Sequence, residues 1–600
     1  MKLTKEQINE KLQFIDDYIR QNSNAATASK LDENANIESK NLSTLASELH
    51  KDLNIELNNT IIYNKLEELF DKKTADSFLD DLNKKLIYVH DNSSIITPYC
   101  ASVSLYPFLL NGTKSLGGVS NAPKHLESFC GSYINLVFQL ASQFLGAIAT
   151  IEFPLYFYHF AKKDYGEKFW LSNKRITESC LQQVVYSINQ PAASRNYQSL
   201  FVNFSILDKY YFNGLFGDFY FPDGSQVDWE GFKEFQKFFL DWINKERTRE
   251  LLTFPVITVT LLHDGETYKD QEMGDFFTSE MSKGNSFFVY LSDSVDSLSS
   301  CCRLSNQIET QDFSYSLGAG GIKTGSKKVI TINANRLIQH YKDYGKDHKT
   351  AFCEIVPRIH KYLYAFNNIL EDLNKNNMLP AYKANFISLK DQYLTIGING
   401  IVEAAEFLNI TPDYNKVYKK FLIECLQSIY KLNRDASKKY NVKFNTEFVP
   451  GESLGVKNAK WDKEWGYESP RDCYNSYFYP VESDISPIDK IKLHGKEIIK
   501  YLDGGSALHL NLEQYPTASG YRKLFDLLIK HGCNYFTTNI LVTCCNDCGY
   551  IDKFTRKKCS KCFGTNISYA TRVIGYLKKI DHFSETRQKE AAVRKYHKKP

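Results

Sequence analysis

Four cysteines in the last sixty residues fall into two Cys-x-x-Cys pairs: Cys545 with Cys548, and Cys559 with Cys562. This spacing lets four thiolates reach one tetrahedral ion, and the glycines after the pairs, Gly549 and Gly564, suit the turns. The pattern predicts a structural zinc ribbon with a hairpin between the pairs. Disulfides or a redox-active Cys-x-x-Cys are the alternatives. Cys544 is either a spare thiol or the partner of Cys548 in a shifted register.

The composition is that of an ordinary globular protein, with 43% hydrophobic and 24% charged residues. No stretch approaches about 18 uninterrupted apolar residues, and the N-terminus lacks the apolar core of a signal peptide. We therefore expect a cytoplasmic protein without a membrane segment. Its 14 cysteines are then expected to be reduced thiols, metal ligands or catalysts. A net charge of +4 is too small to indicate nucleic-acid binding.

The chain divides into three parts by its apolar pattern. Residues 1–85 show helical spacing, residues 86–540 mix helical patterns with β-branched runs, and residues 541–600 hold the cysteine pairs. The run at 253–260 is typical of a buried strand. Periodicity alone thus predicts a mixed α/β fold.

Three further stretches carry local predictions. The apolar run at 134–154 predicts a buried helix, and the basic tail from 587 to 600 is expected to be exposed. The glycine-dense stretch at 316–325 suggests a phosphate-binding loop, but it lacks the Gly-Lys-Ser/Thr ending and leads into a strand. It is therefore not a P-loop.

Two motifs place cysteines next to polar residues. Cys301 and Cys302 precede an arginine, and adjacent cysteines of an extended chain point to opposite faces. A strand ending in His90-Asp91 leads to Cys100. Buried thiols and a strand-end cap are the plain interpretations of these two motifs.

Gly575 lies in an Arg-Val-x-Gly-Tyr-Leu segment shortly after the cysteine pairs, and taken alone it indicates a turn. In this context the segment resembles the glycyl-radical loop of the anaerobic (class III) ribonucleoside-triphosphate reductases. A radical stored on a backbone Cα requires glycine, because only a carbon without a side chain flattens freely between its amide and carbonyl. Further motifs similar to those of the family follow in family order from about 85 to 590.

The resemblance implies roles for several residues. Gly575 would store the radical, and Cys302, or Cys301 as the fallback, would form the thiyl radical that attacks the ribose. Cys100 would supply reducing equivalents, and Glu452 would act as a base or hydrogen-bond partner for the 3′-hydroxyl. Substrate-binding residues would be Arg195, Gln198, Asn475, Ser476, Gly504 and Gly505, with Arg195 a candidate for the phosphates.

The sequence departs from the family pattern in places. Ile574 stands where cysteine is more usual, and an opening ATP-binding cone is not found. Tyr99 and Ser316 stand where formate-using members have asparagine. In this the chain resembles the subgroup that takes electrons from a thioredoxin- or glutaredoxin-like protein.

The resemblance also implies a fold and partners. The fold would be a ten-stranded α/β barrel of two five-stranded parallel halves, with a finger loop carrying Cys302 through its centre. A homodimer would bind dNTP or ATP effectors and ribonucleoside triphosphate substrates. The radical would be installed by a separate activase that uses S-adenosylmethionine and an iron–sulfur cluster, and oxygen would destroy it. No membrane or nucleic-acid partner is expected.

Two rival functions remain open at this point. A glycyl radical enzyme of the formate-lyase type would share the barrel, although the cysteine ribbon beside Gly575 argues against it. A nucleic-acid-binding ribbon would use a basic face, for which the candidates are Lys553, Arg556, Lys557, Lys558 and Lys561. Such charges are more often a solvated hairpin.

Overall fold

The computed structural model describes most of the chain. The described residues are 4–20, 41–190, 200–295, 297–299, 305–307, 322–449, 451, 453–572 and 575–598. Five predicted site residues lie outside these ranges: Arg195, Gln198, Cys301, Cys302 and Glu452.

Ten strands form the central sheet, and they fall into two groups of five. The first group is β2 (Cys100–Ser102), β3 (Ile148–Ala149), β4 (Val202–Ile206), β5 (Val256–Leu262) and β6 (Phe288–Ser292). The second group is β9 (Thr324–Asn333), β10 (Gln392–Asn399), β11 (Lys443–Glu447), β12 (Leu508–Asn511) and β13 (Tyr535–Asn539). Within each group every pairing between neighbouring named strands is parallel.

The two groups meet in antiparallel pairs, β2 with β9 and β6 with β13. Between β11 and β12 a parallel bridge joins Glu447 to Gly505, and the Gly504 amide donates to the Thr446 carbonyl at 2.8 Å. These contacts close the sheet. The predicted barrel of two five-stranded parallel halves is thus confirmed. A short strand, β1 (Ile87–Val89), adds to β9 in antiparallel fashion.

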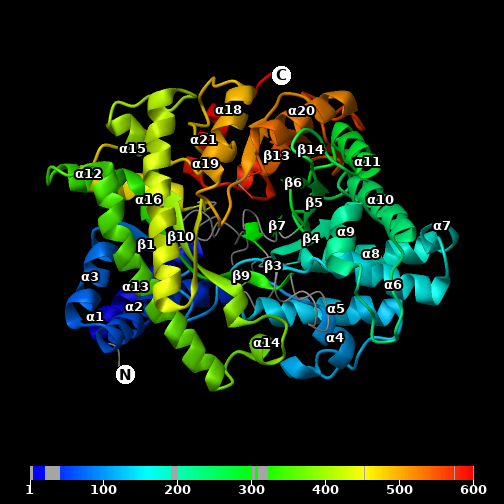
Figure 1. The fold of residues 1–600 in the computed structure, drawn as a ribbon, viewed down its shortest axis with the longest axis horizontal. Helices are drawn as coiled ribbons and strands as arrows, with labels where there is room; N and C mark the ends of the chain where they lie inside the picture. Colours follow the sequence, from blue (N-terminus) through cyan, green and yellow to red (C-terminus); the bar gives the residue numbers. More distant parts are fainter. Residues whose placement is uncertain are drawn as a thin grey trace.

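The barrel strands are buried along most or all of their length, as parallel strands covered by helices must be. All seven residues of β5 and all ten of β9 are buried. Figure 1 shows the helices around the outside, with β7 (Ser297–Ser299) near the middle of the view. β7 pairs with β8 (Ser305–Gln307) in antiparallel fashion, and the predicted finger cysteines, which the structure does not describe, lie between them in the sequence.

Helices follow the strands of both groups. In the first group these are α4 (Tyr106–Asn111), α5 (Leu126–Ala141), α6 (Phe153–Tyr165), α7 (Phe169–Ser172), α8 (Lys174–Ile188), α9 (Lys209–Phe216), α10 (Trp229–Glu246) and α11 (Gln271–Ser282). In the second they are α12 (Ala334–Lys342), α13 (His348–Lys375), α14 (Pro380–Lys383), α15 (Ile401–Phe407), α16 (Lys416–Tyr440), α17 (Leu454–Glu464), α18 (Pro487–Leu493), α19 (Lys496–Ile499) and α20 (Ala518–His531). Among the described helices, none is both long and apolar enough to cross a membrane.

The prediction of one buried helix over 134–154 was wrong. α5 ends at Ala141, and the chain then forms β3 and starts α6 with Pro154 in its first turn. The cause is Gly146, whose amide donates to the Tyr99 carbonyl at 2.6 Å. A Cβ on Gly146 would lie 3.2 Å from the Cβ of Cys100, so glycine lets β3 run beside β2.

The first three helices pack together, and the second and third of them contact α13 of the barrel. They are α1 (Lys5–Arg20), α2 (Leu42–Leu69) and α3 (Lys72–Asn83). Asp81 of α3 is buried and forms an ion pair with Arg358 of α13 at 2.8 Å, and it accepts a hydrogen bond from the Tyr362 hydroxyl at 2.7 Å. Asn58 of α2 donates to the carbonyls of Asn92 and Ser94, which fixes the loop before Cys100.

The last part of the chain forms a small four-stranded sheet and a helix. The strands are β14 (Val542–Cys545), β15 (Ile551–Asp552), β16 (Ile567–Arg572) and β17 (Leu577–Lys579), in the order β15-β14-β16-β17 and all antiparallel. The helix is α21 (Glu585–Val593). A small apolar core of Val542, Ile551 and Ala570 packs against Leu251, which follows α10.

Candidate active site and metal centre

The four predicted zinc ligands come together at the end of the small sheet. The sulfur atoms of Cys545, Cys548, Cys559 and Cys562 all lie within 4.8 Å of one another. The Cys545 and Cys562 sulfurs are 3.5 Å apart, and those of Cys548 and Cys559 are 3.7 Å apart. Zinc–sulfur bonds of about 2.3 Å in a tetrahedron give sulfur separations near 3.8 Å, so the donor set fits Zn²⁺.

Local hydrogen bonds shape this cluster. The amides of Cys562 and Lys561 both lie 3.4 Å from the Cys559 sulfur, and these bonds lower the pKa of Cys559 to about 6. A thiolate is the form that binds metal. Cys544 takes no part in the cluster: it is buried in β14, and burial raises its pKa to about 11. It is therefore the spare thiol rather than a ligand.

Gly575 is buried in the loop between β16 and β17. Arg572 donates from Nη1 to the Gly575 carbonyl at 3.2 Å, and its guanidinium lies 4.5 Å from the ring centre of Phe288 on β6. The next residue, Tyr576, packs its ring against Phe201 and Phe254, with ring centres 5.6 and 5.9 Å away. The glycine loop is thus docked on the barrel beside the starts of β4 and β5.

Helix α21 ties the glycine loop to a second segment. Arg594 donates to the Arg572 carbonyl at 2.7 Å, and Arg587 donates to the carbonyl of Gly451, which precedes Glu452 in the sequence. Glu590 bonds both arginines, Arg594 at 2.8 Å and Arg587 at 3.3 Å. We call these three residues the α21 clamp.

The α21 clamp is buried, so the expectation of an exposed basic tail was wrong for Arg587 and Arg594. Their exposed fractions are 6% and 8%. Burial by itself raises the pKa of Glu590, but the two guanidinium groups more than offset this and hold it below its usual value. The signal in the sequence is the spacing of Arg587, Glu590 and Arg594 on one helical face.

Cys100 lies at the start of β2 and is buried. Its carbonyl accepts a hydrogen bond from the Gln392 side chain at 2.9 Å. Gly325, at φ +151°, packs so closely that a Cβ would lie 2.2 Å from the Cys100 carbonyl oxygen. The backbone of Cys100 is therefore firmly positioned, while its role as a reductant stays a prediction.

Asn475 and Ser476 occupy different surroundings. The Asn475 side chain donates to Glu403 at 2.8 Å and accepts from the Val481 amide at 3.1 Å. Ser476 accepts from the Gly451 amide at 3.1 Å, so its hydroxyl lies beside the segment that leads to Glu452. Asn475 thus holds the loop together, and a contact of either residue with substrate stays a prediction.

Gly504 and Gly505 line the seam where the barrel closes. A Cβ on Gly504 would lie 2.7 Å from the Thr446 carbonyl oxygen, and Gly505 has φ +110°. Both positions therefore require glycine for backbone reasons. Nucleotide binding there stays a prediction.

The basic face proposed for the ribbon is smaller than the sequence suggests. Lys553 turns toward the barrel and donates to Asn244 of α10. Arg556 forms an ion pair with Asp552 at 3.3 Å and lies over the Phe554 ring. Lys557, Lys558 and Lys561 remain as exposed charges, which is typical of a solvated hairpin.

Comparison with known proteins agrees with this architecture. A solved anaerobic ribonucleotide reductase matches with a TM-score of 0.86 and 26% identity, over 99% of this chain and 93% of that one. The Thermotoga maritima anaerobic ribonucleotide reductase in complex with dATP and CTP matches with a TM-score of 0.84 and 26% identity, over 98% and 100% of the two chains. The same protein with dATP bound in its specificity site gives 0.81 and 26%, over 97% and 100%.

No curated protein sequence matches the chain. The family described as "Anaerobic ribonucleoside-triphosphate reductase" matches residues 33–597, which include the whole barrel, the cysteine ribbon and Gly575. The chain therefore belongs to the anaerobic ribonucleoside-triphosphate reductase family and is an oxidoreductase that reduces ribonucleotides.

Proposed function

We propose that this reductase converts ribonucleoside triphosphates to 2′-deoxyribonucleoside triphosphates with a radical stored on Gly575 and passed to Cys302. The observation that carries the proposal is the docking of Gly575. The residue is buried, its carbonyl accepts from Arg572, and Tyr576 packs on the barrel beside it. A glycine in a turn that served only to reverse the chain would not need three separate anchors.

The chemistry follows from bond strengths. A ribose 3′ C–H bond is too strong for a base, but a thiyl radical at Cys302 abstracts the hydrogen atom because the S–H bond formed is nearly as strong. Glu452 accepts the proton of the 3′-hydroxyl, which eases departure of the 2′-hydroxyl as water. Two reducing equivalents are then needed, and one thiol supplies only one of them. Cys100 therefore acts with a second thiol, that of Cys301 or of the proposed redoxin: one thiol hydrogen goes as a proton to the leaving hydroxyl, the other goes to C2′, and the two sulfurs close a disulfide that the redoxin reduces. Cys302 becomes a thiyl radical again when the product radical takes the hydrogen atom back from its thiol.

We assign a structural Zn²⁺ to Cys545, Cys548, Cys559 and Cys562. Their sulfur separations and donor type support this ion, and four protein ligands leave no open position for catalysis. Strand β16 runs from the cluster to Arg572, so the ion stabilises the sheet that carries the glycine loop. The proposed domain division, 1–85, 86–540 and 541–600, places both features in the last part.

The substrates and effectors we propose are nucleotides. The Thermotoga maritima relative was solved with dATP and CTP, and with dATP in a specificity site, which supports triphosphate substrates and dNTP or ATP effectors here. Arg195, Gln198, Asn475, Ser476, Gly504 and Gly505 are the proposed substrate contacts. Ser476 has the best support, because its hydroxyl accepts from the amide of Gly451, which precedes Glu452 in the sequence.

We also propose three protein partners. A homodimer is the expected assembly, and an activase with S-adenosylmethionine and an iron–sulfur cluster would install the radical. The reductant would be a thioredoxin- or glutaredoxin-like protein rather than formate. Tyr99 supports the proposal of a redoxin, because it stands directly before Cys100, where formate-using members have asparagine. Its ring packs edge-on against His90, with 6.0 Å between the ring centres.

The test is an anaerobic activation experiment. The protein is mixed with its activase, S-adenosylmethionine and a strong reductant, frozen, and examined by EPR. We expect a glycyl doublet in the wild type and none in Gly575→Ala, and we expect air to cleave only the activated wild type near residue 575.

A matched control is Gly131→Ala. Gly131 lies within α5, where an added Cβ meets no atom within 4 Å, so this variant should keep the doublet. A chain that stays intact in air and gives no doublet after activation would refute the radical proposal. Turnover of CTP with a redoxin or with formate then identifies the reductant.

A further inference from the structure

One buried carboxylate joins three segments in the second half of the barrel. Asp462 lies on α17, and its exposed fraction is 0%. Its Oδ1 accepts from Asn333 Nδ2 at 3.0 Å and from Arg336 Nε at 2.6 Å. Its Oδ2 accepts from Asn335 Nδ2 at 2.9 Å and from the Tyr474 hydroxyl at 2.6 Å. The carboxylate is thus bonded by donors from the end of β9, from α12 and from the loop that follows α17.

A second polar residue of the same helix makes a similar contact one strand further along the sheet. Asn458, one turn before Asp462 on α17, donates to Asn399 Oδ1 at 2.9 Å. Asn333 and Asn399 are the last residues of β9 and β10, and they are partners in the parallel register of these strands. α17 is therefore fixed across the carboxyl ends of two neighbouring strands, which is where α/β folds place their ligands.

The start of α17 connects this anchorage to Glu452. The helix begins at Leu454, two residues after Glu452 in the sequence. The Gly455 carbonyl accepts from the Tyr474 amide at 3.0 Å, and a Cβ on Gly455 would lie 2.5 Å from the Tyr474 carbonyl oxygen. The first turn of α17 is thus packed tightly against the segment that Asp462 holds through the Tyr474 hydroxyl.

A buried ion pair is not needed merely to hold a helix in place. Asp462 and Arg336 both have fully buried side chains, and their Oδ1 and Nε atoms are 2.6 Å apart. Apolar side chains of similar size usually stabilise a fold as well as a buried ion pair does, or better. What the ionic network adds is direction, because each of its hydrogen bonds requires a defined geometry. The network therefore indicates that the exact position of α17 matters.

From these contacts we propose that Asp462 is a positioning residue of the reaction. It holds α17 and the loop of Tyr474 against the ends of β9 and β10, and it thereby fixes the chain next to Glu452. The inference rests on the proposed role of Glu452 at the 3′-hydroxyl. Asp462 acts through the backbone, since its two oxygens are occupied by four protein donors. A misplacement of about 1 Å can lower the rate of an enzyme by about 100-fold.

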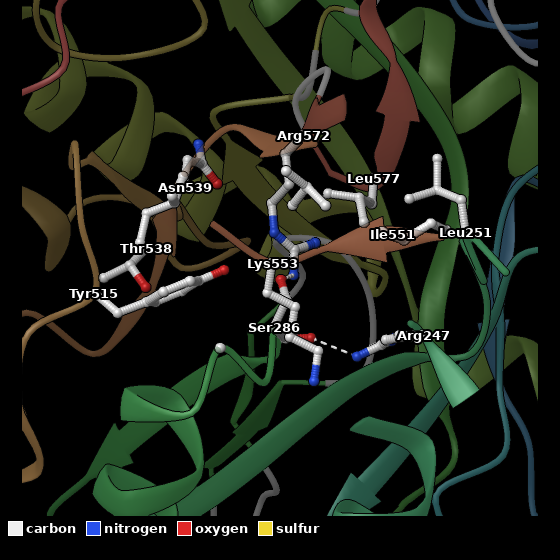
Figure 2. A pocket seen from close by; sticks show the side chains of 13 residues that line it. Arg247, Leu251, Ser286, Tyr515, Thr538, Asn539, Ile551, Lys553, Arg572 and Leu577 are labelled. Atoms are coloured by element: carbon white, nitrogen blue, oxygen red, sulfur yellow. Dashed lines mark hydrogen bonds between the residues drawn. The ribbon is translucent and has the colours of Figure 1, made fainter. Parts of the chain in front are cut away.

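The anchors of the glycine loop are made elsewhere. Figure 2 shows Arg572 and Ser286 among the residues around a small cavity between the ribbon and the barrel, and the Ser286 hydroxyl accepts from Arg572 at 2.8 Å. The four donors to Asp462 are not among the described residues that line this cavity. A substitution of Asp462 should therefore leave the storage of the radical on Gly575 unaffected, which separates positioning from a general loss of structure.

The test compares Asp462→Asn with Glu464→Gln in protein that has been activated anaerobically. Both substitutions remove one carboxylate charge from α17, but Glu464 is exposed and pairs only loosely with Lys460, at 3.9 Å. Asparagine at 462 would turn an NH₂ group toward hydrogen-bond donors, so at least one of the four bonds is lost. For Asp462→Asn we expect a glycyl doublet of wild-type intensity, a KM for CTP within about threefold of the wild type and a kcat about 100-fold lower. Glu464→Gln should match the wild type in all three quantities.

The inference is overturned if the kcat of Asp462→Asn stays within about threefold of the wild type. It is also overturned if the doublet is lost together with turnover, because Asp462 would then support the fold in general. If Asp462→Asn does not fold, Asn458→Ala decides by the same three quantities, since it removes a bond of α17 without leaving a buried charge unpaired. Its kcat should be at least about tenfold lower, and an unchanged kcat refutes the inference. Failure of the proposed function is recognised separately, because the wild type itself would then give no doublet, and the inference would fail with it.

Discussion

The α21 clamp offers a sharp test of how the glycine loop is positioned. Glu590 is a buried carboxylate with two buried arginine partners, and Glu590→Gln keeps its shape while removing its charge. Removing one partner of a buried ion pair costs about 3 to 5 kcal/mol, because the remaining charge is left uncompensated. We take about 3 kcal/mol, since glutamine retains some hydrogen bonds. This corresponds to a roughly 150-fold larger opening equilibrium for the clamp.

The assay is amide hydrogen exchange followed by mass spectrometry, which reports local opening. We expect exchange to accelerate by about two orders of magnitude in peptides that cover α21, and also in those that cover 570–577, because Arg594 would release the Arg572 carbonyl. The matched control is Glu585→Gln. Glu585 lies on the same helix and pairs with Lys589, with exposed fractions of 85% and 66%, so its loss should cost less than about 1 kcal/mol.

The prediction is refuted if Glu590→Gln and Glu585→Gln have the same amide exchange rates. It is also refuted if exchange in Glu590→Gln accelerates only in the peptides of α21 and is unchanged in 570–577. The pH dependence gives a second check. The folded pKa of Glu590 is held below its unfolded value, so its contribution to stability is present above the unfolded pKa, near 4.5. That contribution should disappear as the pH falls through the lower, folded value.

Two further predictions concern the ribbon and the barrel. Cys559→Ser should reduce bound zinc from one ion per chain to well below one, as measured by elemental analysis, and should accelerate exchange in 570–577; an unchanged zinc content would contradict the ligand assignment. Burial raises the pKa of Glu152 to about 7 from 4.5, so between these pH values the folded chain holds a proton that the unfolded chain releases. The free energy of unfolding should therefore fall by about 3 kcal/mol between pH 4.5 and 7. Glu152→Gln should remove that part of the dependence in urea unfolding curves; an identical pH profile would show that Glu152 is ionised in the fold.

The features that could be predicted from the sequence are those with short-range causes. Cys-x-x-Cys spacing is local, and it identified four sulfur atoms that the fold brings within 4.8 Å. Strand β5 could be predicted from the run at 253–260, because β-branched residues suit a strand that is buried on both faces. The prediction of a closed barrel came from the resemblance to the reductase family, because no local pattern shows that Glu447 pairs with Gly505.

The features that were missed have long-range causes. The helix predicted over 134–154 is interrupted because Gly146 must approach Tyr99, a residue 47 positions earlier. The charges of Arg587, Arg594 and Lys553 indicate exposure, yet each lies against a partner that only the tertiary structure supplies. The charge of a side chain therefore does not by itself show whether that side chain is exposed.

The α21 clamp also has a consequence for biosynthesis. Translation begins at the N-terminus, so Cys100 leaves the ribosome roughly 25 to 100 s before Glu590 at ordinary elongation rates. All ten barrel strands precede α21 in the chain and are available to fold during that interval. The carbonyls of Arg572 and Gly451 gain their arginine partners only after the helix has been made. The nascent enzyme is thus assembled in an order in which the barrel is built first and the glycine is secured last.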